Sequence, residues 1–356
     1  MLEIEEGILM SYWCFDISDE IFINEIEKLL GKKAETTMLV CRKLTPEYVQ
    51  YKTPPLFIRL GKEKIGKSDW SIDIKIYDFG DIIIRASTEI KGSTNKITKF
   101  FNQVEPELKK KIDAVLGKIT EEIKNYIHKP PLKIARASTS YNIFFVHKFG
   151  KGLKPKELIE RYGSEIAHLL RYETKGLSEQ EIKDVLKMSL SYYAEDLTII
   201  DFNSALVYDP RKSYDVPDVL EYAIIELTEL RMYDDLLDKV IETAYDELGK
   251  KRFFGSGAIL NKLSQIRLDI SEVIEKVENY IKLIDDSYLG KVYASASNRF
   301  YLEKWKISVK EKMELLESLY AKNWERLQTR RMLWLETSIV ALFILDVILI
   351  FYEIFG

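Results

Sequence analysis

The chain has 356 residues, of which 31% are charged and 46% hydrophobic, a balance that excludes disordered, collagen-like and polytopic membrane proteins. The net charge of −4 comes from 53 basic and 57 acidic side chains, so no basic excess indicates a specific nucleic-acid partner. Two cysteines are too few for a disulfide framework or a four-cysteine zinc site. The length suits two domains with additional segments.

Residues 1–150 have the pattern of an α/β domain. The best hairpin alternates at Ile72, Ile74 and Ile76, turns around 78–80 and continues over Ile82–Ala86. Pro106 is a possible interruption of the helix predicted over 93–127. The other elements predicted here are strands at Gly7–Phe15, Thr37–Arg42, Leu56–Leu60 and Tyr141–His147, and a helix at Asp19–Leu30.

Residues 151–250 form a second α/β section in this reading. Two helices are expected over Lys154–Leu170 and Ser178–Leu190, followed by short strands at Leu197–Asp201 and Ala205–Tyr208. Pro217 then opens a strong helix over 217–248, because proline is favoured in the first helical turn.

Residues 251–331 predict a long helical hairpin that acts as a stalk or clamp. Apolar residues from Ile259 to Ile284 recur in a heptad pattern, and those from Leu302 to Leu327 follow an eleven-residue period. We place the reversal at the SYLG segment that ends at Gly290. Because the two periods differ, an intramolecular pair is favoured over an intermolecular coiled coil.

Residues 332–355 predict one transmembrane helix, since roughly 20 apolar residues span the hydrocarbon core of a bilayer. Arg326, Arg330 and Arg331 precede this segment and no basic residue follows it. By the positive-inside rule, the body in front of the helix is then cytoplasmic at the cell membrane. A buried amphipathic helix is the alternative. The fold class is therefore α+β: a mixed α/β body, a helical hairpin and a transmembrane helix.

Three acids, Glu336, Asp346 and Glu353, are the only charges after residue 331. Without them the chain has 53 basic and 54 acidic residues, so the body is nearly neutral. On a helix with about 100° per residue they fall within an arc of about 100°. Such a stripe favours self-association or a protonatable site. The alternative is an ordinary anchor that tolerates acids.

A literal P-loop pattern, G-x4-G-K-[ST], runs through Gly61, Gly66, Lys67 and Ser68. A phosphate site needs a helix that begins at the lysine, so that its N-terminal amides face the phosphates. A strand pattern follows here instead. A lysine-rich exposed hairpin loop is therefore the favoured interpretation, with a nucleotide site as the weak alternative.

The helix over 217–248 carries a dense ionic pattern. Arg231 can pair with Asp235 at i+4 and with Asp234 at i+3. Asp234 and Asp238 share a face and are a weak candidate pair for a metal ion, the alternative being an ion-pair face. The three histidines have no metal-ligand spacing. The sequence thus predicts no cofactor and assigns no catalytic residue.

The order of features resembles the uncharacterised family of YagE-type bacterial proteins, yeast Rmd proteins and the mitochondrial "required for meiotic nuclear division" protein. Three segments carry the likeness: Leu186–Phe202, Asp215–Asp238 and the acid-containing Leu335–Ile354. Ala194 fits the family's Ala-Gln-Ser step, whereas Glu195 and Asp196 depart from it. The resemblance implies membrane-anchored, oligomeric tethers or scaffolds without established catalysis, some of which support organellar translation.

Two functional hypotheses follow. The first is a single-pass membrane protein whose cytoplasmic body is a scaffold or tether that contacts the bilayer and self-associates through the C-terminal helices. The second is a nucleotide- or metal-dependent hydrolase that uses the 61–68 loop or the 226–238 carboxylates. The abundance of Lys and Glu, with only five Gln, is typical of a thermophile.

Overall fold

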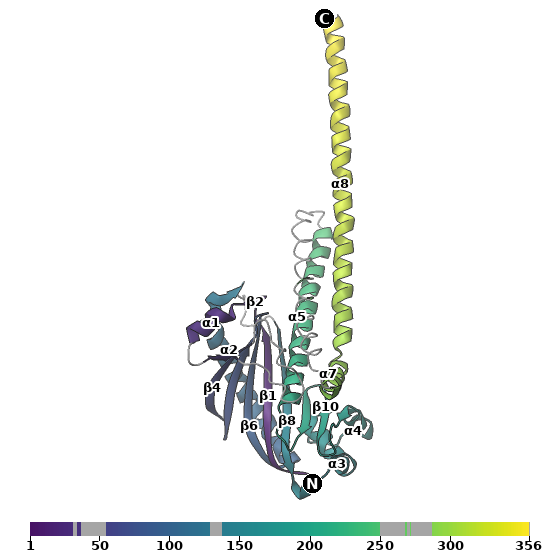
Figure 1. Cartoon of the computed structure of the whole chain (residues 1–356). Coiled ribbons are helices and arrows are strands. Elements are labelled where there is room, and N and C mark those ends of the chain that lie inside the picture. The colour runs from purple at the N-terminus through teal and green to yellow at the C-terminus, as the bar shows by residue number, and fades with distance from the viewer. Residues whose placement is uncertain are drawn as a thin grey trace. The chain divides into compact units, whose positions relative to one another are not determined.

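The computed structural model describes residues 1–30, 34–36, 55–128, 137–249, 268, 271 and 287–355. Its centre is a nine-stranded sheet in the order β3-β4-β5-β6-β1-β8-β11-β10-β9 (Figure 1). A separate two-stranded sheet joins β2 to β7. The strands are β1 (Glu3–Asp16), β2 (Glu20–Ile21), β3 (Ala34–Thr36), β4 (Leu56–Ile65), β5 (Ser68–Ile76), β6 (Asp81–Ser93), β7 (Ile127–His128), β8 (Ala137–Phe149), β9 (Ser189–Leu190), β10 (Leu197–Ile200) and β11 (Ser204–Tyr208).

The sheet crosses the boundary predicted near residue 150. β1 pairs antiparallel with both β6 and β8 along almost its whole length. On its other edge, β8 pairs in parallel with β11, with Asn142 opposite Ser204 and Val146 opposite Tyr208. The two α/β sections predicted as 1–150 and 151–250 therefore contribute strands to one sheet. The strand predicted at Thr37–Arg42 lies outside the described residues.

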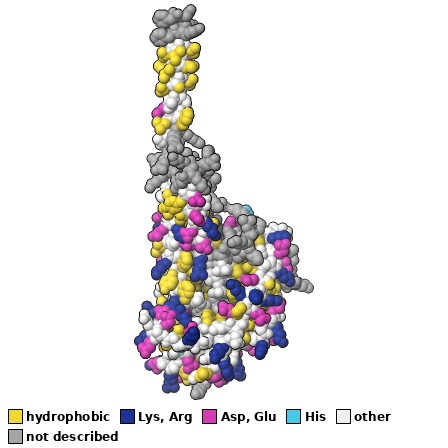
Figure 2. All heavy atoms as spheres, turned by 180° about the vertical axis from the view of Figure 1, so that it is seen from behind, with side chains coloured by type: hydrophobic (Ala, Val, Ile, Leu, Met, Phe, Trp, Pro, Cys, Tyr) yellow, Lys and Arg dark blue, Asp and Glu magenta, His cyan; other side chains and the backbone are white. Residues whose placement is uncertain are grey.

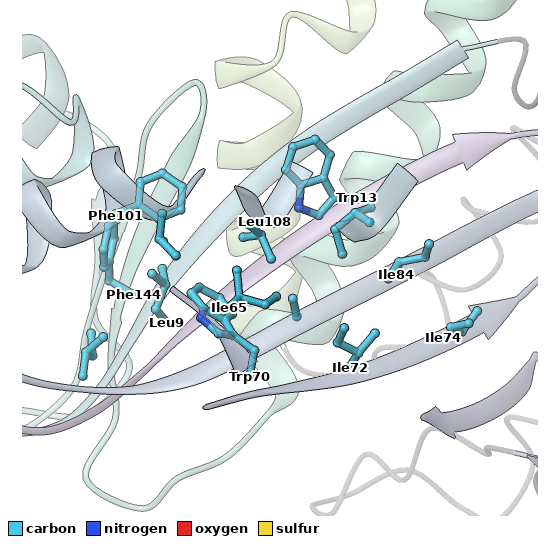
Figure 3. Packing of buried hydrophobic residues seen from close by; sticks show 14 of the residues in the cluster. Leu9, Trp13, Ile65, Trp70, Ile72, Ile74, Ile84, Phe101, Leu108 and Phe144 are labelled. Atoms are coloured by element: carbon cyan, nitrogen blue, oxygen red, sulfur yellow. The ribbon is translucent and has the colours of Figure 1, made fainter. Parts of the chain in front are cut away.

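One face of the sheet holds the alternating isoleucines of the predicted hairpin, Ile72, Ile74 and Ile76. Trp70, Ile72 and Ile74 are buried with Leu9 of β1 and with helix α2 (Thr94–Ile123) (Figure 3). The same cluster includes residues of α1 (Ile23–Leu30), α3 (Pro155–Leu170) and α4 (Glu179–Leu186). α2 buries a residue every three or four positions, from Ile97 to Ile123, as an amphipathic helix requires.

Three helix predictions differ from the structure in detail. α2 continues through Pro106, whose side chain is exposed, because on the solvent side the missing N–H removes only one bond of the helical ladder. The helix predicted from Asp19 begins at Ile23, after β2. The helix predicted over Ser178–Leu190 ends at Leu186, and the chain then enters the edge strand β9.

The opposite face packs against the first part of α5 (Asp215–Gly249), which lies alongside β8, and against α7 (Ser287–Arg299) (Figure 1). Tyr12 of β1, Phe145 of β8 and Ile224 of α5 are fully buried in this second cluster. α5 confirms the strong helix predicted to begin at Pro217, with two additional residues at its start.

The reversal predicted at SYLG is wrong. These residues form the first turn of α7, and among the described residues from 287 onward the helix is interrupted at Phe300 and Tyr301. Phe300 is fully buried against Tyr141, and Tyr301 adopts a left-handed φ of 58°. Gly290 lies inside α7, where a glycine is tolerated. The break between α7 and α8 occurs later, at the buried Phe300. The heptad segment Ile259–Ile284 lies outside the described residues except for 268 and 271.

A single helix, α8 (Leu302–Phe355), contains both the second arm of the predicted hairpin and the predicted transmembrane segment. Within the arm, Leu302, Val309, Met313 and Leu316 are buried, which follows the predicted spacing. The chain divides into two compact units, residues 1–232 with 270–306, and residues 233–269 with 307–356. The mixed α/β body and the helices that follow it confirm the predicted α+β class.

Candidate functional site

The last part of α8 exposes a continuous apolar surface. Within the described chain, Met332–Ile350 is the one helical segment that is long and apolar enough to cross a membrane, and none of it is buried. Trp334 is 75% exposed and Phe343 is 71% exposed. On the face shown in Figure 2, hydrophobic side chains cover most of this part of the helix. At about 1.5 Å per residue, these 19 residues match the hydrocarbon core, about 30 Å thick.

The hydroxyl groups in this apolar segment are satisfied within the helix. Thr337 Oγ1 donates to the Leu333 carbonyl at 2.6 Å, and Ser338 Oγ donates to the Trp334 carbonyl at 2.8 Å. Such bonds remove the cost of placing a hydroxyl group in an apolar medium. The hydroxyls of the segment are thus compatible with lipid on every side.

The charged residues predicted for this region all lie in α8. Glu336 and Asp346 are exposed. The helix is continuous between them. At about 100° per residue, the two side chains are therefore about 80° apart around its axis, as the sequence predicted. The side chains of Arg326, Arg330, Arg331 and Glu353 are outside the described part of the structure.

The P-loop pattern lies on a hairpin. β4 and β5 pair antiparallel, with Ile65 opposite Ser68, so that Gly66 and Lys67 form an exposed turn. Gly66 has a φ of +60°, and Gly61, at a register shift in β4, has a φ of +99°. Both glycines thus adopt positive φ angles that the hairpin requires and that other residues rarely adopt. A strand begins at Ser68 where a phosphate site needs a helix, so this geometry gives the hydrolase hypothesis no support.

Asp234 and Asp238 share a lysine. Lys312 Nζ of α8 lies 2.8 Å from Asp234 Oδ1 and 2.6 Å from Asp238 Oδ1. Ser308 Oγ donates to Asp234 Oδ1 at 2.8 Å. Burial alone would lower the pKa of Lys312, but its hydrogen bonds to both aspartates raise the pKa. A lysine ammonium therefore occupies the position between the two carboxylates that a cation would need.

Arg231 lies against an aromatic ring. Its guanidinium carbon is 5.7 Å from the centre of the Trp305 ring, within the range of a cation–π contact. Asp235, the predicted i+4 partner of Arg231, is exposed. The ion pair between Arg231 and Asp235 stays a prediction.

The sequence reading missed a buried charged cluster between the sheet and α5, formed by Lys75, Tyr77, Asp218 and Glu221. Lys75 Nζ lies 2.9 Å from Glu221 Oε2 and 3.5 Å from Asp218 Oδ1. Tyr77 donates its hydroxyl to Glu221 Oε1 at 2.7 Å. Burial raises the pKa of Asp218 to about 6, and the Lys75 charge offsets only part of this effect.

The alternation of β5 indicates on which face of the sheet Lys75 and Tyr77 lie, but not which residues they meet. Ile72, Ile74 and Ile76 face one side of the sheet, so Lys75 and Tyr77 must face the other. A lysine among otherwise buried positions needs a carboxylate partner. Nothing in the order of residues shows that this partner is Glu221, which lies 146 residues away.

A second buried cluster centres on Asp201, just after β10. Asp201 Oδ2 lies 2.7 Å from Arg171 Nε, and Arg299 Nε donates to Asp201 Oδ1 at 2.9 Å. Arg299 Nη1 also lies 2.9 Å from Asp184 Oδ2. This Asp201 cluster connects α3, α4, β10 and α7. Asp201 thus has two arginine partners.

The protein-family comparison matches most of this body. The family described as "Uncharacterized protein MJ0711, N-terminal domain" matches residues 6–215, which is more than half of the chain. The chain belongs to this family. A relative named "Uncharacterized protein MJ0711", from Methanocaldococcus jannaschii, is 26% identical over 223 residues, or 61% of this chain and 68% of that protein. No solved structure matches the chain.

Membership in the MJ0711 family corrects the resemblance to the YagE and Rmd proteins. That likeness rested on the second half of the chain, whereas the MJ0711 match begins at residue 6 and ends at residue 215. A proline-led helix and an apolar helix preceded by arginines are features that general helix and membrane physics favours in many proteins. They therefore do not distinguish one family from another.

Both buried clusters connect the MJ0711 domain to elements that follow it. Lys75 lies within the matched range and its partner Glu221 lies beyond it. In the same way, Asp201 lies within the range and Arg299 beyond it. The charged clusters thus attach α5 and α7 to the domain.

Proposed function

We propose that this MJ0711-family chain is a single-pass membrane protein, anchored by the α8 segment 332–355, whose α+β body is a cytoplasmic scaffold or tether. The observation that carries the proposal is the fully exposed apolar segment Met332–Ile350. A soluble protein rarely exposes an apolar surface of this extent unless lipid or protein covers it. No catalysis is part of this proposal.

The insertion energetics favour a transmembrane position. Met332–Ile350 contains twelve Leu, Ile, Val and Phe residues, and each contributes about −0.3 to −0.6 kcal/mol near the centre of a membrane helix. Their sum is roughly −4 to −7 kcal/mol, while one central acid costs about 2.5 to 3.5 kcal/mol. Asp346 therefore reduces the driving force without abolishing it.

The scaffold role is supported by how the body uses its charges. The buried acids Glu221 and Asp201 are bound by Lys75 and by two arginines. These ion pairs connect helices to the sheet. Such connections are expected for a rigid body that binds other proteins as a scaffold. Self-association through the stripe of Glu336, Asp346 and Glu353 would make such a scaffold oligomeric.

Membrane fractionation tests the anchor. We expect the full chain to stay in the membrane fraction after alkaline carbonate washing, and a chain lacking residues 332–356 to become soluble. Val340→Arg with Ile344→Arg places two charges in the apolar segment and should act like the deletion. Thr337→Ala is the matched control and should fractionate as the wild type does. Unchanged fractionation of the deleted chain would refute the anchor.

Protease protection tests the orientation. An N-terminal epitope should be digested in inverted vesicles and protected in right-side-out vesicles if the body is cytoplasmic. Replacing Arg326, Arg330 and Arg331 with glutamate should increase the fraction of inverted chains, because basic residues set the orientation. The opposite protection pattern for the wild-type chain would contradict a cytoplasmic body.

A further inference from the structure

The body contains a cavity of about 190 Å³ that the proposed anchor and the two charged clusters do not use. It lies between the first residues of β8, the turn after β10, one face of α5 and the end of α7. Its lining residues are Ser138, Thr139, Ser140, Tyr141, Phe202, Asn203, Ile224, Leu227, Arg231 and Phe300. All of them belong to one compact unit.

The two kinds of side chain in the lining indicate an amphiphilic ligand. Phe202, Ile224, Leu227 and Phe300 supply apolar wall, and Arg231 supplies a permanent positive charge. A guanidinium presents planar donors that match a carboxylate in a bidentate pair. The Trp305 ring, 5.7 Å from the guanidinium carbon, limits the directions in which this side chain can point.

A buried hydroxyl in the lining calls for a partner. Thr139 is 8% exposed, and its Oγ1 is buried without a hydrogen bond to any described residue. The parallel pairing of β8 with β11 begins only at Asn142, so Thr139 lies beyond the end of that ladder. Buried polar atoms are usually satisfied by protein, water or ligand. A ligand oxygen in the cavity would satisfy this one.

A buried acid beside the lining is already paired with cations. Asp201 lies next to the lining residue Phe202, and it is paired with both Arg171 and Arg299. The volume also limits the ligand, since a cavity of about 150 Å³ holds one benzene molecule. A single ring or a short branched chain with one carboxylate fits this size.

We propose that the cavity binds a small carboxylate with an apolar body, with Arg231 holding the carboxylate, Thr139 donating its hydroxyl and the Phe202–Phe300 side taking the apolar part. This proposal does not depend on the membrane anchor. It predicts that binding requires both a negative charge and an apolar group on the same molecule.

Calorimetric titration of the full chain in detergent tests the proposal with defined probes. Benzoate and 3-methylbutanoate carry both groups, benzyl alcohol lacks the charge and acetate lacks the apolar body. We expect saturable binding of at least one of the first two probes, and at least ten-fold weaker binding of the last two. Absence of saturable binding by benzoate and 3-methylbutanoate would overturn the proposal, as would equal binding of benzyl alcohol.

Substitutions locate the binding at this cavity. Arg231→Met should weaken the tighter carboxylate at least ten-fold, Arg231→Lys should retain part of the affinity, and Thr139→Val should weaken it a few-fold. Arg161→Met removes an exposed arginine of α3 and should leave the affinity unchanged. Thermal melting checks that each variant folds. If Arg231→Met does not fold, unchanged affinity in both Arg231→Lys and Thr139→Val overturns the proposal.

Discussion

At the scale of single residues, the body depends on buried charges that have specific partners. Glu221 and Glu226 of α5 are 0% and 1% exposed. Lys75 Nζ lies 2.9 Å from the first, and Lys306 Nζ lies 2.8 Å from the second. Tyr77 and Tyr293 donate hydroxyls to the same two carboxylates. A buried ion pair adds little net stability, but the loss of one partner leaves a charge in a medium that solvates it poorly.

Removing Lys75 alone should therefore lower the free energy of unfolding more than removing Lys75 and Glu221 together. We expect Lys75→Met to lower the free energy of unfolding by about 3–5 kcal/mol, measured by urea denaturation. Lys75→Met with Glu221→Leu should recover part of this loss, since Glu221 is then no longer a buried charge without a partner, whereas Asp218 still lacks Lys75. Lys183→Met, in an exposed pair with Glu179, is the control and should change little. A double variant less stable than Lys75→Met would contradict this account.

The stability of the fold should depend on the protonation of Asp218. Its pKa is raised from 3.8 to about 6 by burial, with Lys75, Glu221 and Arg85 as the charged groups facing it. The folded state therefore binds this proton more tightly than the unfolded state, and its stabilising effect is lost as the pH rises from 4 to 6.

Comparison with Asp218→Asn isolates this effect. We expect the unfolding free energy of the wild type, relative to that of Asp218→Asn, to fall by roughly 1–3 kcal/mol between pH 4 and pH 7 and then to level off. Denaturation at a series of pH values measures the difference. A difference that is constant or rises with pH would show that Asp218 does not titrate in this way.

At the scale of elements, the turn between β5 and β6 is tightly packed. Gly80, between β5 and β6, has a φ of +113° and accepts a hydrogen bond from Ile17 N at 3.1 Å. A Cβ atom at this position would lie 1.7 Å from the Ser18 carbonyl oxygen. Only glycine permits both this backbone conformation and this close approach.

Two glycine-to-alanine substitutions should have opposite effects. Gly80→Ala should destabilise the fold by about 3 kcal/mol or more, because backbone strain and a backbone clash occur together. Gly117→Ala lies inside α2, where a Cβ meets no atom within 4 Å, and should stabilise the fold by about 0.5–1 kcal/mol. Thermal or urea denaturation measures both. Similar effects of the two changes would contradict the packing described for Gly80.

At the scale of the whole molecule, one helix carries two different chemistries. α8 is amphipathic where Leu302, Val309 and Met313 are buried, and over Met332–Ile350 it is predominantly apolar and fully exposed. No helix-breaking residue separates the two parts. The proposed membrane anchor is thus a direct extension of a helix whose first part is amphipathic.

The acid stripe should contribute to self-association of the proposed anchor. In chemical crosslinking within vesicles, Asp346→Leu should weaken association about three- to ten-fold, the range of one polar contact between membrane helices. Asp346→Asn should retain part of it through hydrogen bonding. Ile344→Ala, about 160° away around the helix, is the control and should leave the crosslinked fraction unchanged. Equal crosslinking of Asp346→Leu and wild type would place the contact elsewhere.

The elements with strong local periodicity could be predicted from the sequence, namely the β5–β6 hairpin, α5 and the apolar end of α8. Their hydrophobic spacing is a property of neighbouring residues, so no tertiary information was needed. The break in the helix at Phe300 and Tyr301 could not be predicted in this way. The chain breaks at Phe300 because its ring packs against Tyr141, a residue distant in sequence.

What the sequence alone determined about this protein is its class, its near-neutral body and an apolar helix long enough to span a bilayer. Only the tertiary structure decided which charges meet. Lys75 reaches Glu221 across 146 residues, and Arg299 reaches Asp201 across 98. The parallel pairing of β8 with β11 likewise joins two predicted sections in one sheet. Such contacts depend on the register of distant strands and helices, which hydrophobic periodicity does not encode.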